Sequence, residues 1–189
     1  MSRLGLVLAI WVFLGLDLGL SKPLLELGAS GVAPSFLFIL AAFVAMCGTG
    51  RAPFWTALAL GLLADLMADV GLTSPEGRAV IIGPHALAFL VGTQLVIALR
   101  GVMIRRNPLT LGFLACTGAA VAQIVLVAIL WVRMLFDPLA ISPTHDLLVG
   151  LGSALYTGAL AVPLALVLLP AATFLGLPSQ QPRRFSRHA

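Results

Sequence analysis

The chain has 189 residues, of which 60% are hydrophobic and 10% are charged, and its formal net charge is +4. A typical soluble domain carries about 25% charged residues, so these charges are too few to cover a soluble globule, and lipid must solvate much of the chain. The eleven basic residues are scattered between apolar segments and form no basic face interleaved with aromatic residues, which argues against nucleic-acid binding.

Six apolar segments follow one another, and each predicts a transmembrane helix. The first could pass for a signal peptide, but Asp17 interrupts it and no small-residue cleavage site follows closely, so we expect it to be retained. A span needs about 20 residues, so the shorter second and third segments should extend into their flanks. The segments cover residues 4–20, 33–47, 54–69, 84–100, 109–132 and 147–169.

Prolines stand where several of these helices should begin. Pro34, Pro53, Pro84 and Pro108 lie at or near the starts of the second to fifth segments, where the missing N–H of proline costs nothing. Pro163 lies inside the sixth segment and predicts a kink. The expected fold is therefore all-α, a polytopic bundle of six transmembrane helices.

The basic residues predict how this bundle lies in the membrane. Cytoplasmic connections carry an excess of Lys and Arg. With the N-terminus inside, only Lys22, Arg78 and Arg133 are left on the outer side. We therefore expect a bacterial inner-membrane protein with both termini in the cytoplasm, made of a six-helix domain (residues 1–177) and a basic cytoplasmic tail (residues 178–189). The predicted inner side carries Arg3, Arg51, Arg100, Arg105, Arg106, Arg183, Arg184 and Arg187.

An aspartate within the third segment is the sharpest polar feature. Asp65 and Asp69 are four residues apart and should share one helix face. A membrane-embedded Asp costs about 2.5–3.5 kcal/mol on the insertion scale, and such residues usually face the bundle interior and find a partner. We expect Asp65 to bond a hydroxyl, an amide or a neighbouring helix, and Gln94 and Gln123 are candidates on the fourth and fifth helices.

Catalytic chemistry is not indicated by these residues. Gly61-x3-Asp65-x3-Asp69 resembles half of the CDP-alcohol phosphatidyltransferase signature, but the preceding Val44–Arg51 stretch lacks the further carboxylates that a two-metal site needs. The three histidines have no metal-ligand spacing, and no nucleophile elbow or phosphate-binding loop occurs. We predict no catalytic, metal or cofactor site, and we expect His85 to cap or pack at the start of the fourth helix.

Small residues form a stripe on the sixth helix. Gly150, Ala154 and Gly158 recur every four residues, and small residues let membrane helices approach closely. Packing inside the bundle is the favoured interpretation. An interface with a partner, including a homodimer, is the alternative.

Three short segments resemble the rod shape-determining protein MreD family. They are Pro34-Ser-Phe-Leu-Phe-Ile-Leu, Gly61-Leu-Leu-Ala-Asp65 and Gly83-Pro84-His85-Ala86-Leu87. The likeness extends over residues 4–169 and includes the basic turn after the fourth helix. Two departures are Ser35, where the family usually has an acid, and a longer outer connection over residues 70–83.

This resemblance implies a non-catalytic membrane scaffold of the bacterial cell-elongation (rod) complex that supports cell shape and peptidoglycan synthesis. It would bind the single transmembrane helix of MreC and help link MreB filaments to a RodA-type synthase and its transpeptidase. The six-helix layout is also similar to the substrate-binding subunits of energy-coupling-factor vitamin transporters. Against that alternative, the chain has a single tyrosine, Tyr156, and few polar groups that could converge on a ligand.

Overall fold

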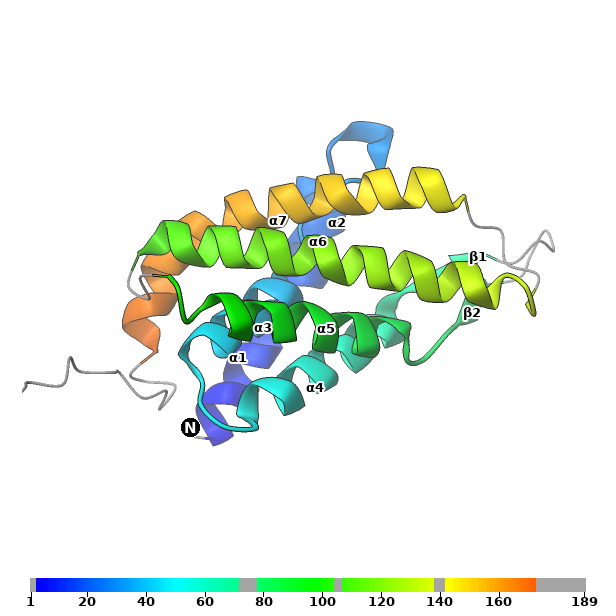
Figure 1. The fold of residues 1–189 in the computed structure, drawn as a ribbon. Helices are drawn as coiled ribbons and strands as arrows, with labels where there is room; N and C mark the ends of the chain where they lie inside the picture. Colours follow the sequence, from blue (N-terminus) through cyan, green and yellow to red (C-terminus); the bar gives the residue numbers. More distant parts are fainter. Residues whose placement is uncertain (1–2, 72–77, 104–106, 138–141, 173–189) are drawn as a thin grey trace, which may run out of the picture.

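The computed structural model describes residues 3–71, 78–103, 107–137 and 142–172. Over these residues the chain is a helical bundle with one short antiparallel β-hairpin (Figure 1). Its elements are α1 (Arg3–Leu16), the π-helix η1 (Asp17–Ser21), α2 (Lys22–Leu25), the 3-10 turn η2 (Gly28–Ser30), α3 (Phe36–Cys47), α4 (Ala52–Met67), β1 (Asp69–Gly71), β2 (Arg78–Val80), α5 (Pro84–Leu99), α6 (Pro108–Arg133) and α7 (Pro143–Ala171).

The predicted all-α fold is confirmed, and each of the six apolar segments contains one main helix. Three helical stretches, Leu4–Ser21, Pro108–Arg133 and Pro143–Ala171, are long and apolar enough to cross a membrane. The other three helices, α3, α4 and α5, have 12, 16 and 16 residues. At 1.5 Å per residue, they measure about 18–24 Å, which is less than the roughly 30 Å hydrocarbon core of a bilayer.

Proline sets most of the helix starts, as predicted. Pro84 and Pro108 are the first residues of α5 and α6, and Pro53 lies in the first turn of α4. The prediction was wrong at Pro34, because α3 begins two residues later, with Ser35 as its N-cap. The C-terminal part of α7 turns away from the line of its first half (Figure 1), as expected for a helix with Pro163 in its interior.

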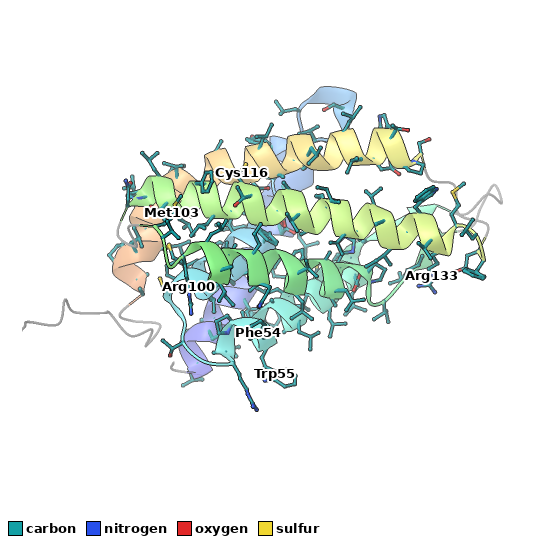
Figure 2. All side chains as sticks on the ribbon, viewed as in Figure 1. Phe54, Trp55, Arg100, Met103, Cys116 and Arg133 are labelled. Carbon is teal, nitrogen blue, oxygen red and sulfur yellow. The ribbon has the colours of Figure 1, made fainter. Side chains whose placement is uncertain are left out.

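Helix α3 forms the centre of the bundle. Every residue from Phe36 to Met46 is buried, and α3 contacts α1, α4, α5, α6 and α7. A helix that is apolar on all sides belongs in a core. The remaining helices therefore wrap around α3, and their outer faces carry exposed apolar side chains such as Leu4, Trp11 and Trp55. Figure 2 shows Trp55 pointing away from α4 into the surroundings of the bundle.

Both ends of α3 are capped by side chains. At the N-terminus, the Ser35 hydroxyl accepts a hydrogen bond from the Phe38 N–H (3.3 Å), and Asp17 Oδ1 accepts from the Phe36 N–H (2.8 Å). At the C-terminus, Arg100 Nη1 donates to the carbonyls of Ala45 and Gly48. These caps satisfy backbone groups that a buried helix end leaves unpaired, and the acid and the base lie at the ends that the helix dipole favours.

Helices α4, α5, α6 and α7 pack as successive neighbours. Figure 1 shows the N-terminus, the turn between α3 and α4 and the last turns of α5 and α7 at one end of the bundle. The hairpin and the end of α6 lie at the opposite end. The first turn of α1 and the last turn of α7 thus lie toward the same end of the bundle. The predicted tail, residues 178–189, lies outside the described residues.

Candidate functional site

Asp65 joins α4 to the start of α5. Its side chain is fully buried, and its carboxylate accepts hydrogen bonds from the backbone N–H groups of Gly83 (2.8 Å), His85 (2.9 Å) and Ala86 (3.3 Å). The His85 ring adds a fourth contact, with Nδ1 2.9 Å from Asp65 Oδ1. The carboxylate satisfies orphan N–H groups of the first turn and places a negative charge at the positive end of the helix dipole. Asp65 is thus the N-terminal cap of α5, supplied by the preceding helix.

Two glycines make this capping contact sterically feasible. A Cβ atom on Gly61 would lie 2.5 Å from Ala86 Cα and 2.7 Å from the His85 carbonyl oxygen, so α4 and α5 can approach this closely only where Gly61 stands. The backbone of Gly83 has a φ of 122°, a value that residues with a side chain rarely adopt. The structure therefore brings four of the predicted motif residues, Gly61, Asp65, Gly83 and His85, into one interhelical joint.

The structure confirms that Asp65 bonds to a neighbouring helix, but two details expected of Asp65 were wrong. Gln94 is exposed on α5, and Asp65 hydrogen-bonds to the start of α5 instead of to Gln94 or Gln123. The shared helix face with Asp69 is also absent, because α4 ends at Met67 and Asp69 is the first residue of β1. Sequence spacing indicated a buried carboxylate that needed a partner, but it could not show that the partner was a backbone.

His85 has one ring nitrogen in this joint and one outside it. A carboxylate only accepts hydrogen bonds, so Nδ1 carries the hydrogen toward Asp65, and in the neutral ring Nε2 is then an acceptor. The side chain is 23% exposed, and it lines a neighbouring cavity. The expectation that His85 caps or packs at the start of this helix agrees with its position next to the Asp65 cap.

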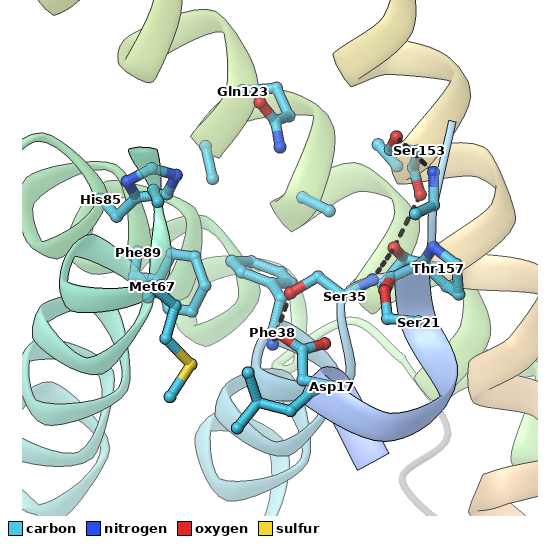
Figure 3. A pocket seen from close by; sticks show the side chains of 18 residues that line it. Asp17, Ser21, Ser35, Phe38, Met67, His85, Phe89, Gln123, Ser153 and Thr157 are labelled. Atoms are coloured by element: carbon cyan, nitrogen blue, oxygen red, sulfur yellow. Dashed lines mark hydrogen bonds between the residues drawn. The ribbon is translucent and has the colours of Figure 1, made fainter. Parts of the chain in front are cut away.

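The cavity beside His85 has a volume of about 290 Å³ and lies among η1, α3, α4, α5, α6 and α7. Its wall is apolar on one side, where Met67, Phe89 and Phe38 gather, and the Phe38 and Phe89 rings meet edge to face with centroids 5.1 Å apart. Figure 3 shows these three side chains near His85. The polar wall residues are Asp17, Ser21, Ser35, His85, Gln123, Ser153 and Thr157.

Most of the hydroxyls in this wall already hold the chain segment that leads into α3. Ser153 Oγ accepts from the Ala33 N–H (3.2 Å), and Thr157 Oγ1 accepts from the Ser35 N–H (3.0 Å), as Figure 3 shows. Ser21 Oγ donates to the Pro34 carbonyl (2.5 Å). The predicted motif residue Pro34 therefore sits at the cavity wall, tied to η1.

The small-residue stripe of α7 faces α6. A Cβ atom on Gly158 would lie 2.5 Å from Cys116 Cβ, and one on Gly150 would lie 3.0 Å from the Gln123 side-chain oxygen. Ala154, between them, is 2% exposed and lines the cavity. In this chain the stripe lets α6 and α7 approach closely, which is the favoured interpretation from the sequence.

Within the described ranges, no group of three or more His, Cys, Asp or Glu side chains could hold a metal ion. A comparison of this chain with protein-family models, with curated proteins and with solved structures finds no match.

The capping roles of Asp17, Ser35 and Arg100 at the two ends of α3 were not predicted from the sequence. The available signals were an acid interrupting the first apolar segment and an arginine at the end of the fourth.

Proposed function

We propose that this protein is a non-catalytic, MreD-like membrane scaffold of the bacterial cell-elongation complex. The observation that carries the proposal is the joint formed by Gly61, Asp65, Gly83 and His85. These residues come from two of the three segments on which the family resemblance rests. In the joint they fix one helix against another and use their polar groups for that contact.

The third segment adds to the same picture. It contains Pro34, which borders the cavity that His85 also lines, and Phe38, which packs on Phe89 of α5. Residues whose spacing suggested the family are thus neighbours in space. A rigid arrangement at this end of the bundle would suit a protein whose task is to hold other membrane proteins.

We propose six membrane passages with both termini in the cytoplasm. Although α3, α4 and α5 are short, each is flanked by further apolar or extended residues, and a short span is accommodated by bilayer thinning at modest cost. An alkaline phosphatase fusion after Val80 is expected to be active and one after Met103 inactive. The reverse pattern would invert the proposed topology.

The partner proposed is a single-pass, MreC-like membrane protein, and an apolar bundle with small-residue faces can receive such a helix. The test is affinity purification of the full chain in a mild detergent, with the co-purifying proteins identified by mass spectrometry. We expect a single-pass partner with the wild type and with Asp146→Ala, and reduced recovery with Asp65→Ala. Recovery of no elongation protein by the folded wild type would refute the scaffold.

The cavity favours a second candidate, the substrate-binding subunit of an energy-coupling-factor type transporter, because it places several polar side chains around one partly open space. Ligand sites of this kind combine an apolar wall with a few convergent polar groups. The same purification distinguishes the two functions. Recovery of an energising pair of ATPases in place of a single-pass partner would favour the transporter.

A further inference from the structure

Two polar side chains line the cavity and keep hydrogen-bonding atoms that no described residue uses. Gln123 lies at the middle of α6 and lines the cavity, and its amide makes no hydrogen bond to the described residues. His85 uses Nδ1 for the hydrogen bond to Asp65, so Nε2 is the ring nitrogen that can bind a ligand. Figure 3 shows Gln123 and His85 on the same side of the cavity, above Phe38 and Ser35. Polar groups that lack a hydrogen-bond partner are costly in a membrane interior, and polar residues there mark functional sites.

The chemistry of these two groups defines what they can bind. A primary amide offers both donors and an acceptor, and Nε2 of a neutral ring whose Nδ1 carries the hydrogen is an acceptor. A matching ligand therefore needs at least one donor and one acceptor close together. A carboxamide or a hydroxyl group meets that requirement.

The charges around the cavity disfavour an ionic ligand. No Lys or Arg is among the lining residues that the structure describes, so a bound anion would find no permanent cation there. The Asp17 and Asp65 carboxylates already accept backbone N–H groups at the starts of α3 and α5, where they offset the positive ends of the two helix dipoles. Burying an unpaired ionic group is far more costly than burying a neutral one that is hydrogen-bonded.

We propose that this cavity binds a small, uncharged molecule that carries a carboxamide or hydroxyl group on an apolar body. The polar group would lie between Gln123 and His85, and the apolar part would lie against Phe38, Met67 and Phe89. A volume of about 290 Å³ is close to the lower end of known ligand cavities, so the molecule is small. This inference goes beyond the scaffold, because it requires no partner protein.

The test uses the purified full-length protein in detergent and three probes of one shape and different charge: benzamide, benzoate and benzylammonium. Binding is measured by equilibrium dialysis against protein-free micelles, which corrects for partition into detergent. Benzamide is expected to bind at least tenfold more tightly than either ion, because benzoate would find no cation among the described wall residues and Asp17, the one carboxylate among them, already accepts the Phe36 N–H. Equal or tighter binding of either ion would overturn the proposal.

Matched variants locate the binding. Gln123→Met keeps the side-chain size but removes the amide, and we expect benzamide to bind about fivefold more weakly, as for one lost hydrogen bond. Gln94→Met makes the same change at an exposed position of α5 and should leave binding unchanged. If Gln123→Met fails to fold, Ala119→Leu fills the cavity from another wall residue and should abolish binding. Benzamide binding that survives in the folded variants would refute the assignment of this site.

A hydroxyl group could also come from a lipid headgroup. Nanodiscs of phosphatidylcholine that contain diacylglycerol, an uncharged lipid whose headgroup is a hydroxyl, are compared with nanodiscs of phosphatidylcholine alone. Weaker benzamide binding in the presence of diacylglycerol would identify a lipid as the occupant, and equal binding would favour a soluble molecule. A scaffold that fails to retain its partner in the purification leaves these measurements unaffected, so the two proposals can fail separately.

Discussion

Replacing Asp65 tests the interhelical cap directly. Asp65→Ala removes the acceptor for three backbone N–H groups and for the His85 ring. Hydrogen bonds to charged groups contribute about 1.5–3 kcal/mol each, and removing one partner of a buried charged contact costs about 3–5 kcal/mol. Because contacts to one carboxylate are not additive, we expect Asp65→Ala to lower the free energy of unfolding by about 3–5 kcal/mol.

Two further variants separate the cap from a general loss of charge. Asp65→Asn keeps one acceptor oxygen but turns an NH2 group toward backbone donors, so we expect a smaller loss of about 1–3 kcal/mol. Asp146→Ala removes an acid from the first turn of α7, where the side chain is 44% exposed. Surface changes of this kind usually stay within about 0.5 kcal/mol.

Unfolding can be followed by tryptophan fluorescence as the purified protein is titrated with a denaturing detergent in mixed micelles. The expected order of stability is wild type and Asp146→Ala together, then Asp65→Asn, then Asp65→Ala. If Asp65→Ala costs no more than Asp146→Ala, the carboxylate does not hold α5, and the joint between α4 and α5 has been misinterpreted.

Two other predictions use the same unfolding measurement. Gly61→Ala should cost about 2 kcal/mol, since its Cβ would meet backbone atoms of α5 at 2.5–2.9 Å. Gly15→Ala, with nothing within 4 Å, should be neutral, so equal losses would contradict the close approach. Thr93→Val should stabilise the protein by about 1 kcal/mol, because the buried Thr93 hydroxyl has no hydrogen-bond partner within the described part of the chain. Thr56→Val loses a bond to the Ala52 carbonyl (2.9 Å) and should bring no gain; an equal gain in both variants would argue against an unsatisfied Thr93.

The helices could be predicted from the sequence because apolar length and proline position determine them locally. The predicted segment 84–100 became α5 (Pro84–Leu99), and the segment 109–132 became α6 (Pro108–Arg133). Within the connection over residues 70–83, the β1–β2 pairing was not predicted. Strand pairing depends on which backbones meet, and no apolar periodicity marks it in so short a segment.

The candidate site could be predicted only in part. The cost of a carboxylate in a membrane made Asp65 conspicuous. The motif segments also contain Gly61, four residues before Asp65, and Gly83, two residues before His85. The partners of Asp65 could not be predicted, because backbone N–H groups carry no sequence signal. The cavity was missed for a similar reason: its wall combines residues from η1, α3, α6 and α7, whose arrangement follows from packing around a central helix.

The way α3 is capped has a consequence for biogenesis. Asp17 precedes this helix in the chain, whereas Arg100 comes only after α4 and α5, 53 residues beyond the last residue of α3, Cys47. During synthesis, the carbonyls of Ala45 and Gly48 therefore lack this arginine until α4 and α5 have been made and inserted. A nascent chain interrupted before that point would carry an apolar helix whose C-terminal carbonyls lack the hydrogen bonds from Arg100, a form that membrane quality control could recognise and remove.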